Sequence, residues 1–246
     1  MNADHAAQLR LLDLQGSDTA LAQLAHRRAT LPELAEIAKR DERRREVHDA
    51  VVQAETDLAD ISGEQRRLEN EVDAVRNRAT RDDQRLQSGG LPAKELEGLQ
   101  HEITTLARRQ STLEDDLLEV MERREELESA AAALGAQRAE IAAEYDELVA
   151  VRDAAFAEID ESTARRSTER DELAATIPAD LLALYERARE HSGGVGAAIL
   201  RQRRCEGCHI ELSGSELAAV RSAADDEVVR CDNCRRILIR TAESGL

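Results

Sequence analysis

The sequence contains almost no aromatic residues, and this scarcity argues against a large globular core. Among 246 residues there are two Tyr, one Phe and no Trp, whereas 35% of the residues are charged. Most positions are therefore either small or charged, a composition that is typical of long helices and coiled coils. High charge is also typical of disordered chains, but the regular apolar spacing described below favours helices.

The chain also lacks a long hydrophobic run. No stretch approaches the roughly 20 apolar residues that a membrane-spanning helix requires. The first residues, MNADHAAQLRLLDLQ, have neither the basic start nor the apolar centre of an export signal. We therefore expect a cytoplasmic protein that does not associate with membranes, in a compartment where thiols stay reduced.

Residue patterns of catalytic sites are missing as well. The sequence has no Gly-rich phosphate loop, no Ser, His and Asp at a spacing that suggests a triad, and no carboxylate pair distinct from a charged helix surface. We expect that the protein is not an enzyme.

Negative charge dominates, but it is unevenly distributed. The net charge is −17, while residues 181–246 contain ten Arg against ten Asp or Glu, so the whole excess lies within residues 1–180. An acidic helical surface repels nucleic acid. Any contact with RNA or DNA is therefore expected from the C-terminal part.

Apolar residues at alternating steps of three and four predict two long helices. One series extends from Val47 to Leu86 and the other from Leu96 to Ile159. This is the seven-residue repeat of a coiled coil. The connection QSGGLPAKE contains two Gly, which end helices, and a Pro that suits the first turn of the next one. Such a short connection implies an antiparallel hairpin with its turn at residues 88–92.

Folding the two series about Gly89 aligns their apolar positions. In this arrangement, the sequence numbers of any two residues that face each other add up to about 178. Val75 then faces Ile103, and Arg124 lies near Glu55. The second apolar series is interrupted by polar residues, for which two interpretations stay open. They either fix the register as buried polar groups, or pack their stems flat while their heads reach water. These residues recur every fourteen positions, at Gln110, Arg124, Arg138 and Arg152.

Proline marks two further breaks, because the residue before it disfavours helix. Pro32 follows Leu31 and Pro178 follows Ile177. We predict a mainly α protein with a coiled-coil hairpin domain at residues 1–176, broken near residues 31–32. A second domain, residues 177–246, begins with a short helix at 179–190. The N-terminal helix, at about residues 5–28, is expected to be exposed and available for pairing, so the sequence leaves the oligomeric state open.

All four cysteines lie within thirty residues, as two CxxC pairs. A redox site needs only one such pair opening a helix after a strand, so two symmetric pairs favour zinc. Zinc takes four soft ligands at the corners of a tetrahedron, and each CxxC turn supplies two. Gly207 and Asn233 tolerate the left-handed backbone that we expect in each turn, and His209 is expected at the surface. The ligands predicted for one structural zinc ion are Cys205, Cys208, Cys231 and Cys234.

The residues around the cysteines are predicted to form short elements. Strands are expected at residues 197–200, 227–230 and 236–240, and a helix is expected to start at Ser213, which forms a capping box with Glu216. So small a domain needs a metal or a similar cross-link to fold.

Arginines flank both cysteine pairs. Two interpretations are open: they offset the net charge of −2 on four zinc-bound thiolates, or they bind phosphates or an acidic protein segment. Residues 197–246 contain no aromatic residue, so bases would have no ring to stack on, and any contact with RNA or DNA would depend on phosphates. We expect the first arginine pair, Arg203-Arg204, and the second, Arg235-Arg236, to lie close together. The candidate binding residues are Arg201, Arg203, Arg204, Arg230, Arg235, Arg236 and Arg240.

Over nearly its whole length the sequence resembles a bacterial family of coiled-coil proteins with a C-terminal four-cysteine zinc ribbon, also described as RING-like. The resemblance includes the Leu31-Pro32 break, the hairpin, IPADLLALYERAR, GGVGAAIL and CDNCRRILI. It implies an antiparallel helical hairpin, zinc on the four cysteines and an adaptor role. The family usually has Gly after the last cysteine and a Tyr that closes the strand, where this chain has Arg235 and Ile239.

Together these features predict a non-enzymatic, zinc-binding adaptor with chaperone-like character. The coiled coil would bind partner proteins, and the ribbon would contact protein or nucleic acid. The alternative is an RNA- or DNA-binding protein that acts through the arginine-rich ribbon.

Overall fold

The computed structural model describes residues 1–246, which divide into two compact units. One unit comprises Met1–Leu34 and Ala150–Leu246, and the other comprises Ala35–Val149. None of the helices combines the length and the apolar character needed to cross a bilayer. The elements are α1 (His5–Ala29), α2 (Pro32–Gln87), α3 (Ala93–Ala175), α4 (Ala179–His191), β1 (Ala197–Arg201), β2 (Arg204–Cys205), α5 (Gly214–Ser222), β3 (Val229–Arg230) and β4 (Ile237–Ile239).

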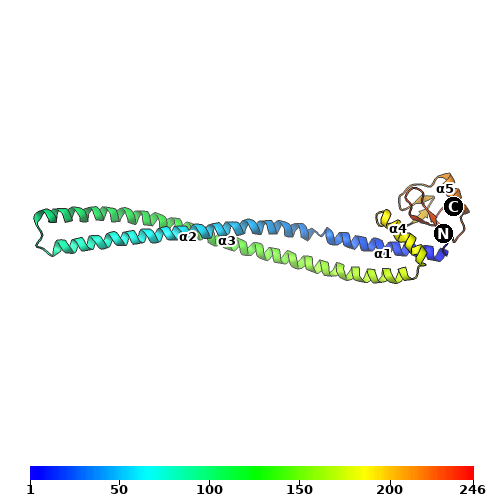
Figure 1. Ribbon diagram of the computed structural model, residues 1–246, viewed down its shortest axis with the longest axis horizontal. Helices are drawn as coiled ribbons and strands as arrows, with labels where there is room; N and C mark the ends of the chain where they lie inside the picture. The colour runs from blue at the N-terminus through cyan, green and yellow to red at the C-terminus, as the bar shows by residue number, and fades with distance from the viewer. The chain divides into compact units, whose positions relative to one another are not determined.

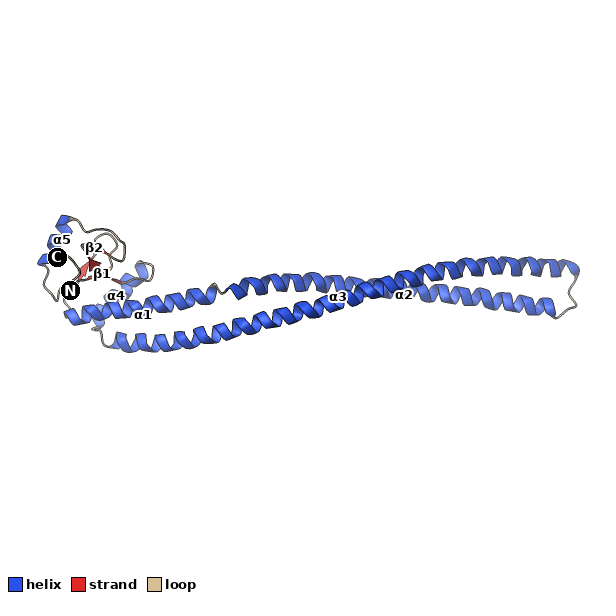
Figure 2. Cartoon of the chain, turned by 180° about the vertical axis from the view of Figure 1, so that it is seen from behind, coloured by secondary structure: helices blue, strands red, loops and turns tan.

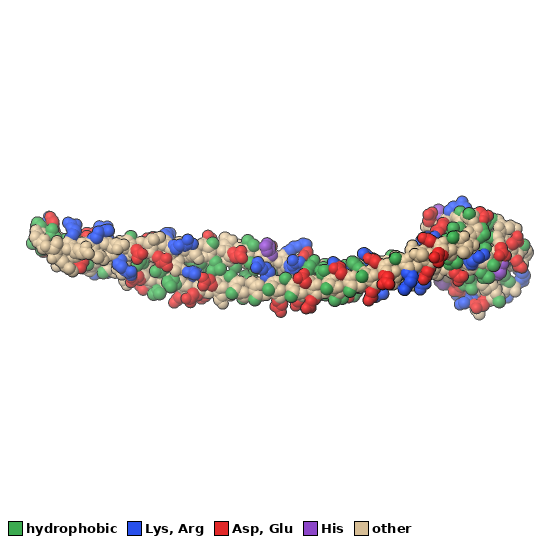
Figure 3. Space-filling model, turned by 90° about the horizontal axis from the view of Figure 1, so that it is seen from below, with side chains coloured by type: hydrophobic (Ala, Val, Ile, Leu, Met, Phe, Trp, Pro, Cys, Tyr) green, Lys and Arg blue, Asp and Glu red, His purple; other side chains and the backbone are tan.

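The unit Ala35–Val149 is a helical hairpin, as the repeat predicted. Figure 1 shows α2 and α3 lying antiparallel and joined by one short turn. The turn occupies residues 88–92, and Gly89 and Gly90 have φ angles of 71° and 81°, a left-handed conformation that glycine adopts without strain. Acidic and basic side chains are interspersed over the surface of the hairpin (Figure 3).

Apolar side chains from both helices fill the seam of the hairpin. One cluster near its middle consists of Ile61, Leu68, Val72, Leu113 and Val120. A second consists of Val47, Val51 and Ile141. All eight residues occupy positions that the seven-residue repeat assigned to the seam, so the repeat identified the buried face correctly.

The predicted register agrees with the ion pairs near the turn, but the predicted proximity of Arg124 to Glu55 is wrong. The residue numbers of Arg78 and Glu102, an ion pair across the seam near the turn, add up to 180, close to the predicted 178. Farther from the turn, those of Gln65 and Arg124 add up to 189. Arg124 donates to Gln65 Oε1 at 2.9 Å and therefore does not meet Glu55. A shift by one heptad pairs apolar with apolar positions equally well, so periodicity alone does not determine which pairing forms.

Two of the polar residues of the second series, Arg124 and Arg152, have partly exposed side chains. The side chain of Arg124 is 39% exposed, and its guanidinium also pairs with Glu128 one turn along α3. Arg152 is partly exposed and pairs with its neighbour Asp153. For these two residues the structure favours stems that pack beside the seam and heads that reach solvent.

The other unit contains a four-stranded sheet in the order β2-β1-β4-β3. Figure 2 labels its strands β1 and β2, which lie near α4 and α5. The central strands β1 and β4 are parallel, with Ala197 opposite Ile237 and Ile199 opposite Ile239. Both edge strands pair antiparallel with their neighbours. The predicted strands are present but shorter, and α5 begins with the predicted capping box between Ser213 and Glu216.

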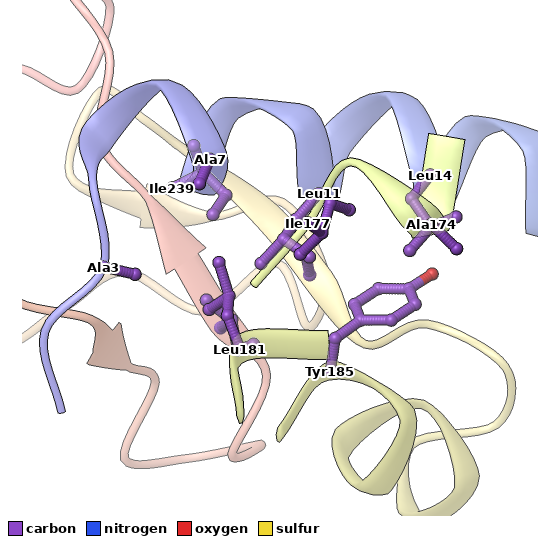
Figure 4. Packing of buried hydrophobic residues seen from close by; sticks show 11 residues of the cluster. Ala3, Ala7, Leu11, Leu14, Ala174, Ile177, Leu181, Tyr185 and Ile239 are labelled. Atoms are coloured by element: carbon purple, nitrogen blue, oxygen red, sulfur yellow. The ribbon is translucent and has the colours of Figure 1, made fainter. Parts of the chain in front are cut away.

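Helix α1 packs against this sheet and against α4. Leu11 and Leu14 are fully buried in a cluster that also contains Leu181, Tyr185 and Ile239 (Figure 4). The expectation of an exposed N-terminal helix is therefore wrong, and the compact unit does not begin at residue 177. The apolar face of α1 is covered by α4 and the sheet of its own chain, which leaves that face unavailable for pairing with a second copy.

Buried polar side chains add specific contacts to this packing. Gln15 Oε1 accepts hydrogen bonds from the backbone of Gly196 at 2.6 Å and from the Tyr185 hydroxyl at 3.2 Å. The Tyr185 hydroxyl shares its one proton between Gln15 and Asp18, and the shorter contact, 2.6 Å, is to Asp18 Oδ2. Arg170 Nε pairs with Asp18 at 3.2 Å. Burial and the Asp18 carboxylate raise the pKa of Tyr185, so the phenol stays neutral. These bonds attach α1 to α3, α4 and the start of β1.

Substitution of one buried leucine tests this arrangement. Leu11→Ala removes side-chain contacts inside the shared cluster, and we expect a loss of about 2–5 kcal/mol in the stability of this unit. Hydrogen exchange should show faster exchange in β1 and β4 as well as in α1. Leu9→Ala, on the exposed side of the same helix, should change little. If Leu11→Ala leaves the exchange of β1 and β4 unaltered, α1 does not stabilise the ribbon.

Candidate metal centre

Four cysteine sulfurs converge between the two knuckles, that is, the two CxxC turns. All four sulfurs lie within 4.8 Å of one another. Cys205 and Cys234 are 3.9 Å apart between sulfurs, as are Cys208 and Cys231, too far for disulfides. Zinc–sulfur bonds of about 2.3 Å in a tetrahedron place sulfurs about 3.8 Å apart. The donor set and its spacing therefore fit a four-thiolate zinc site.

The two knuckles have the same backbone geometry. In each, the residue after the second cysteine has a positive φ, 59° at His209 and 63° at Arg235. Its backbone N–H donates to the carbonyl of the first cysteine, at 2.7 Å in the first knuckle and 2.8 Å in the second. The left-handed residues are therefore not Gly207 and Asn233, as predicted, but the residues two positions later.

Gly207 is required for a different reason. A Cβ atom at this position would lie 2.5 Å from Cδ of Arg236 and 3.0 Å from Cβ of Ala198. The first knuckle thus lies directly against the second arginine pair and β1. The backbone N–H groups of Gly207 and Cys208 face the sulfur of Cys205.

Burial and hydrogen bonds set different proton affinities on the metal-free thiols. Burial raises the pKa of Cys205 to about 12. Burial also acts to raise the pKa of Cys234, but hydrogen bonds from the backbone and side chain of Arg236 outweigh it and lower the value to about 7. Cys234 therefore loses its proton more readily than Cys205, and zinc binding would have to displace a proton from Cys205.

Two of the seven predicted binding arginines are used inside the fold. Arg240 is buried, and its guanidinium donates to five backbone carbonyls. The first belongs to Val220 in the last turn of α5, and the other four belong to the segment after this helix, up to Glu227. Arg236 is half-buried and donates to the carbonyls of Ser192 and Val195. Neither side chain is free to bind a partner, which corrects their assignment to a binding face.

The other five arginines are exposed but do not form a single cluster. Arg204 belongs to β2 and Arg230 to β3, the opposite edges of the sheet. Arg201 pairs with Glu243 at 2.7 Å, and Arg203 Nε donates to the carbonyl of Gly245. Arg235 forms no ion pair. His209 is exposed, as predicted, and lies outside the four-sulfur cluster.

The arrangement of a helical hairpin and a four-cysteine ribbon matches described protein families. The CT398-like coiled coil hairpin domain matches residues 14–193, and the C4-type zinc ribbon domain matches residues 204–238. This chain belongs to the CT398-like hairpin family. The resemblance noted from the sequence is thereby confirmed, as is its mainly α fold of hairpin plus ribbon.

Similarity to known proteins extends over nearly the whole chain. An uncharacterized protein of Mycobacterium tuberculosis is 43% identical over 240 residues, which cover 98% of each chain. A solved structure from Mycobacterium smegmatis is 40% identical, with a TM-score of 0.89 over 98% of this chain and 100% of that one. The structure of CT398 from Chlamydia trachomatis has a TM-score of 0.71 at 21% identity, over 96% and 98% of the chains, and shows the shared fold.

Loss of one sulfur should disrupt the ribbon together with its helical supports. We expect Cys231→Ser to release zinc, because a site with three thiolates binds the metal less tightly, and to expose β1 and β4 to exchange. Since these strands pack on α1 and α4, both helices should loosen as well, while helical circular dichroism from residues 35–149 persists. Metal analysis and hydrogen exchange measure the two effects.

The matched control is His209→Asn, which removes a neighbouring imidazole and suits the left-handed backbone. This variant should keep its zinc. Loss of zinc in His209→Asn, or retention in Cys231→Ser, would contradict the assignment of the ligands.

Proposed function

We propose that the protein is a non-enzymatic cytoplasmic adaptor. Its helical hairpin binds a partner protein as a chaperone-like surface, and its ribbon binds a further protein segment. One zinc ion per chain would be held by Cys205, Cys208, Cys231 and Cys234. Four protein ligands fill a tetrahedral site and leave no position for water or substrate, so the metal would supply a structural cross-link only.

The observation that carries the adaptor role is an exposed apolar pair on the hairpin. Leu118 is 58% exposed and Met121 is 39% exposed, one helical turn apart on α3. The seam between α2 and α3 is already filled by other residues, so this pair is not needed for the hairpin itself. Adjacent exposed apolar side chains on a charged helix suit a helical partner surface, and a thioether adapts to varied shapes.

The exposed arginines of the ribbon support a second candidate, contact with RNA or DNA. Arg204 and Arg235 have no acidic partner within the chain. Phosphate-led binding of this kind would weaken steeply as salt rises. The absence of aromatic residues from 197–246 removes base stacking, which sequence-tolerant single-strand binding usually requires. This is why we place the adaptor first.

Site-specific photo-crosslinking in cells tests the proposal. A photoreactive amino acid in place of Leu118 should yield a discrete protein adduct, and Met121→Glu in the same chain should reduce it several-fold by placing a charge in the contact. The control position is Arg67, which is similarly exposed on α2. Adducts to RNA or DNA at position 204, without any protein adduct at 118, would favour the second candidate. No adduct at 118 would contradict the adaptor role of the hairpin.

A further inference from the structure

A basic hollow lies between α4 and the second knuckle. Its volume is about 470 Å³, within the range of ligand pockets. Leu184 and Ala188 of α4 contribute apolar surface, while Arg187 and His191 come from the same helix and Arg230 and Arg235 from the ribbon. Helix α4 and the ribbon both belong to the unit that includes Ala150–Leu246. No Asp or Glu lines the hollow.

The three arginines of this hollow have no ion-pair partner anywhere in the chain, although acidic residues outnumber basic ones. Arg187 Nε donates to a carbonyl of its own helix at 3.2 Å, and Arg230 Nε donates to the carbonyl of Arg235 at 3.0 Å. A guanidinium has five N–H donors. Most of the donors around the hollow therefore lack a partner within the protein.

The charge of the zinc site does not account for all of these arginines. A four-thiolate zinc site has a net charge of −2, and Arg236 already faces the sulfur of Cys234 while its guanidinium binds two backbone carbonyls. After Arg236 offsets one of these two negative charges, one remains, whereas the three arginines of the hollow carry three positive charges. One of them, Arg187, belongs to α4 and not to the ribbon. Their convergence on one hollow points to an external anion.

We propose that this hollow binds an acidic protein segment in which carboxylates flank an aliphatic side chain. Each guanidinium would form paired hydrogen bonds with a carboxylate, and the aliphatic group would cover Leu184 and Ala188. The apolar surface favours a side chain over a phosphate backbone, and the hollow has no aromatic ring on which a base could stack. This inference rests on the proposed function, since it specifies the segment that the ribbon contacts.

Binding of a defined peptide tests the proposal. The probe is a fluorescein-labelled peptide of sequence Glu-Asp-Leu-Glu-Leu-Asp, measured by fluorescence anisotropy with the full-length, zinc-loaded protein. The same peptide with Gln and Asn in place of Glu and Asp should bind at least about tenfold more weakly, because it cannot pair with the guanidinium groups. A labelled oligouridylate of twelve nucleotides serves as the phosphate probe.

Three arginine variants separate the hollow from general surface charge. Arg187→Gln removes one charge from α4, and Arg235→Gly removes another while suiting the left-handed backbone at that position. Each should weaken binding of the acidic peptide about tenfold, with zinc content and circular dichroism unchanged. Arg204→Gln, at the opposite edge of the sheet, should bind as the parent does.

Each remaining outcome decides against the hollow. Equal loss in all three variants would show non-specific attraction, and unchanged binding in Arg187→Gln and Arg235→Gly would exclude the hollow. Preference for the oligouridylate would indicate a nucleic-acid surface instead. If the acidic peptide does not bind but position 118 still yields protein adducts in cells, the adaptor function stands and only this inference fails.

Discussion

The folding of the ribbon depends on bringing four sulfurs within 4.8 Å of one another. The strands around them have between two and five residues, too short to form an independently stable sheet. A metal cross-link between the knuckles joins the start of the ribbon to its last strand. The opposite side of the sheet depends on α1 and α4, which bury Ala197, Ile237 and Ile239. Thiolate ligation and helix packing thus stabilise the same two central strands from different sides.

Two arginines of the ribbon help to hold this arrangement together, whereas others leave their guanidinium groups exposed. Arg236 contacts the first knuckle and holds the carbonyls that precede β1, and Arg240 binds the carbonyls around the end of α5. Arg230 and Arg235 instead have ends exposed beside α4, where Arg187 adds a third charge. A basic surface at the ribbon and an apolar pair on the hairpin would give the chain two chemically different contact sites. Two sites of different character suit an adaptor.

Much of this architecture could be predicted from the sequence because its determinants are local or periodic. Seam positions such as Leu68 and Leu113 follow a seven-residue repeat, and the cysteines lie at fixed spacings. The partner of Arg124 could not be predicted, since a shift of one heptad preserves the apolar pairing of the seam. Docking of α1 was missed because its contact face mixes Leu11 and Leu14 with the polar Gln15 and Asp18, whose partners lie more than 150 residues away. Such a face looks solvent-exposed until the fold supplies those partners.

Zinc-edge X-ray absorption on the purified full-length protein tests the central claim most directly. The account predicts one zinc per chain with four sulfur neighbours at about 2.3 Å and no nitrogen or oxygen in the first shell. A sample that folds without stoichiometric zinc, or a spectrum with nitrogen or oxygen among the ligands, would contradict a closed four-thiolate centre. The structural role assigned to the metal would then have to be abandoned.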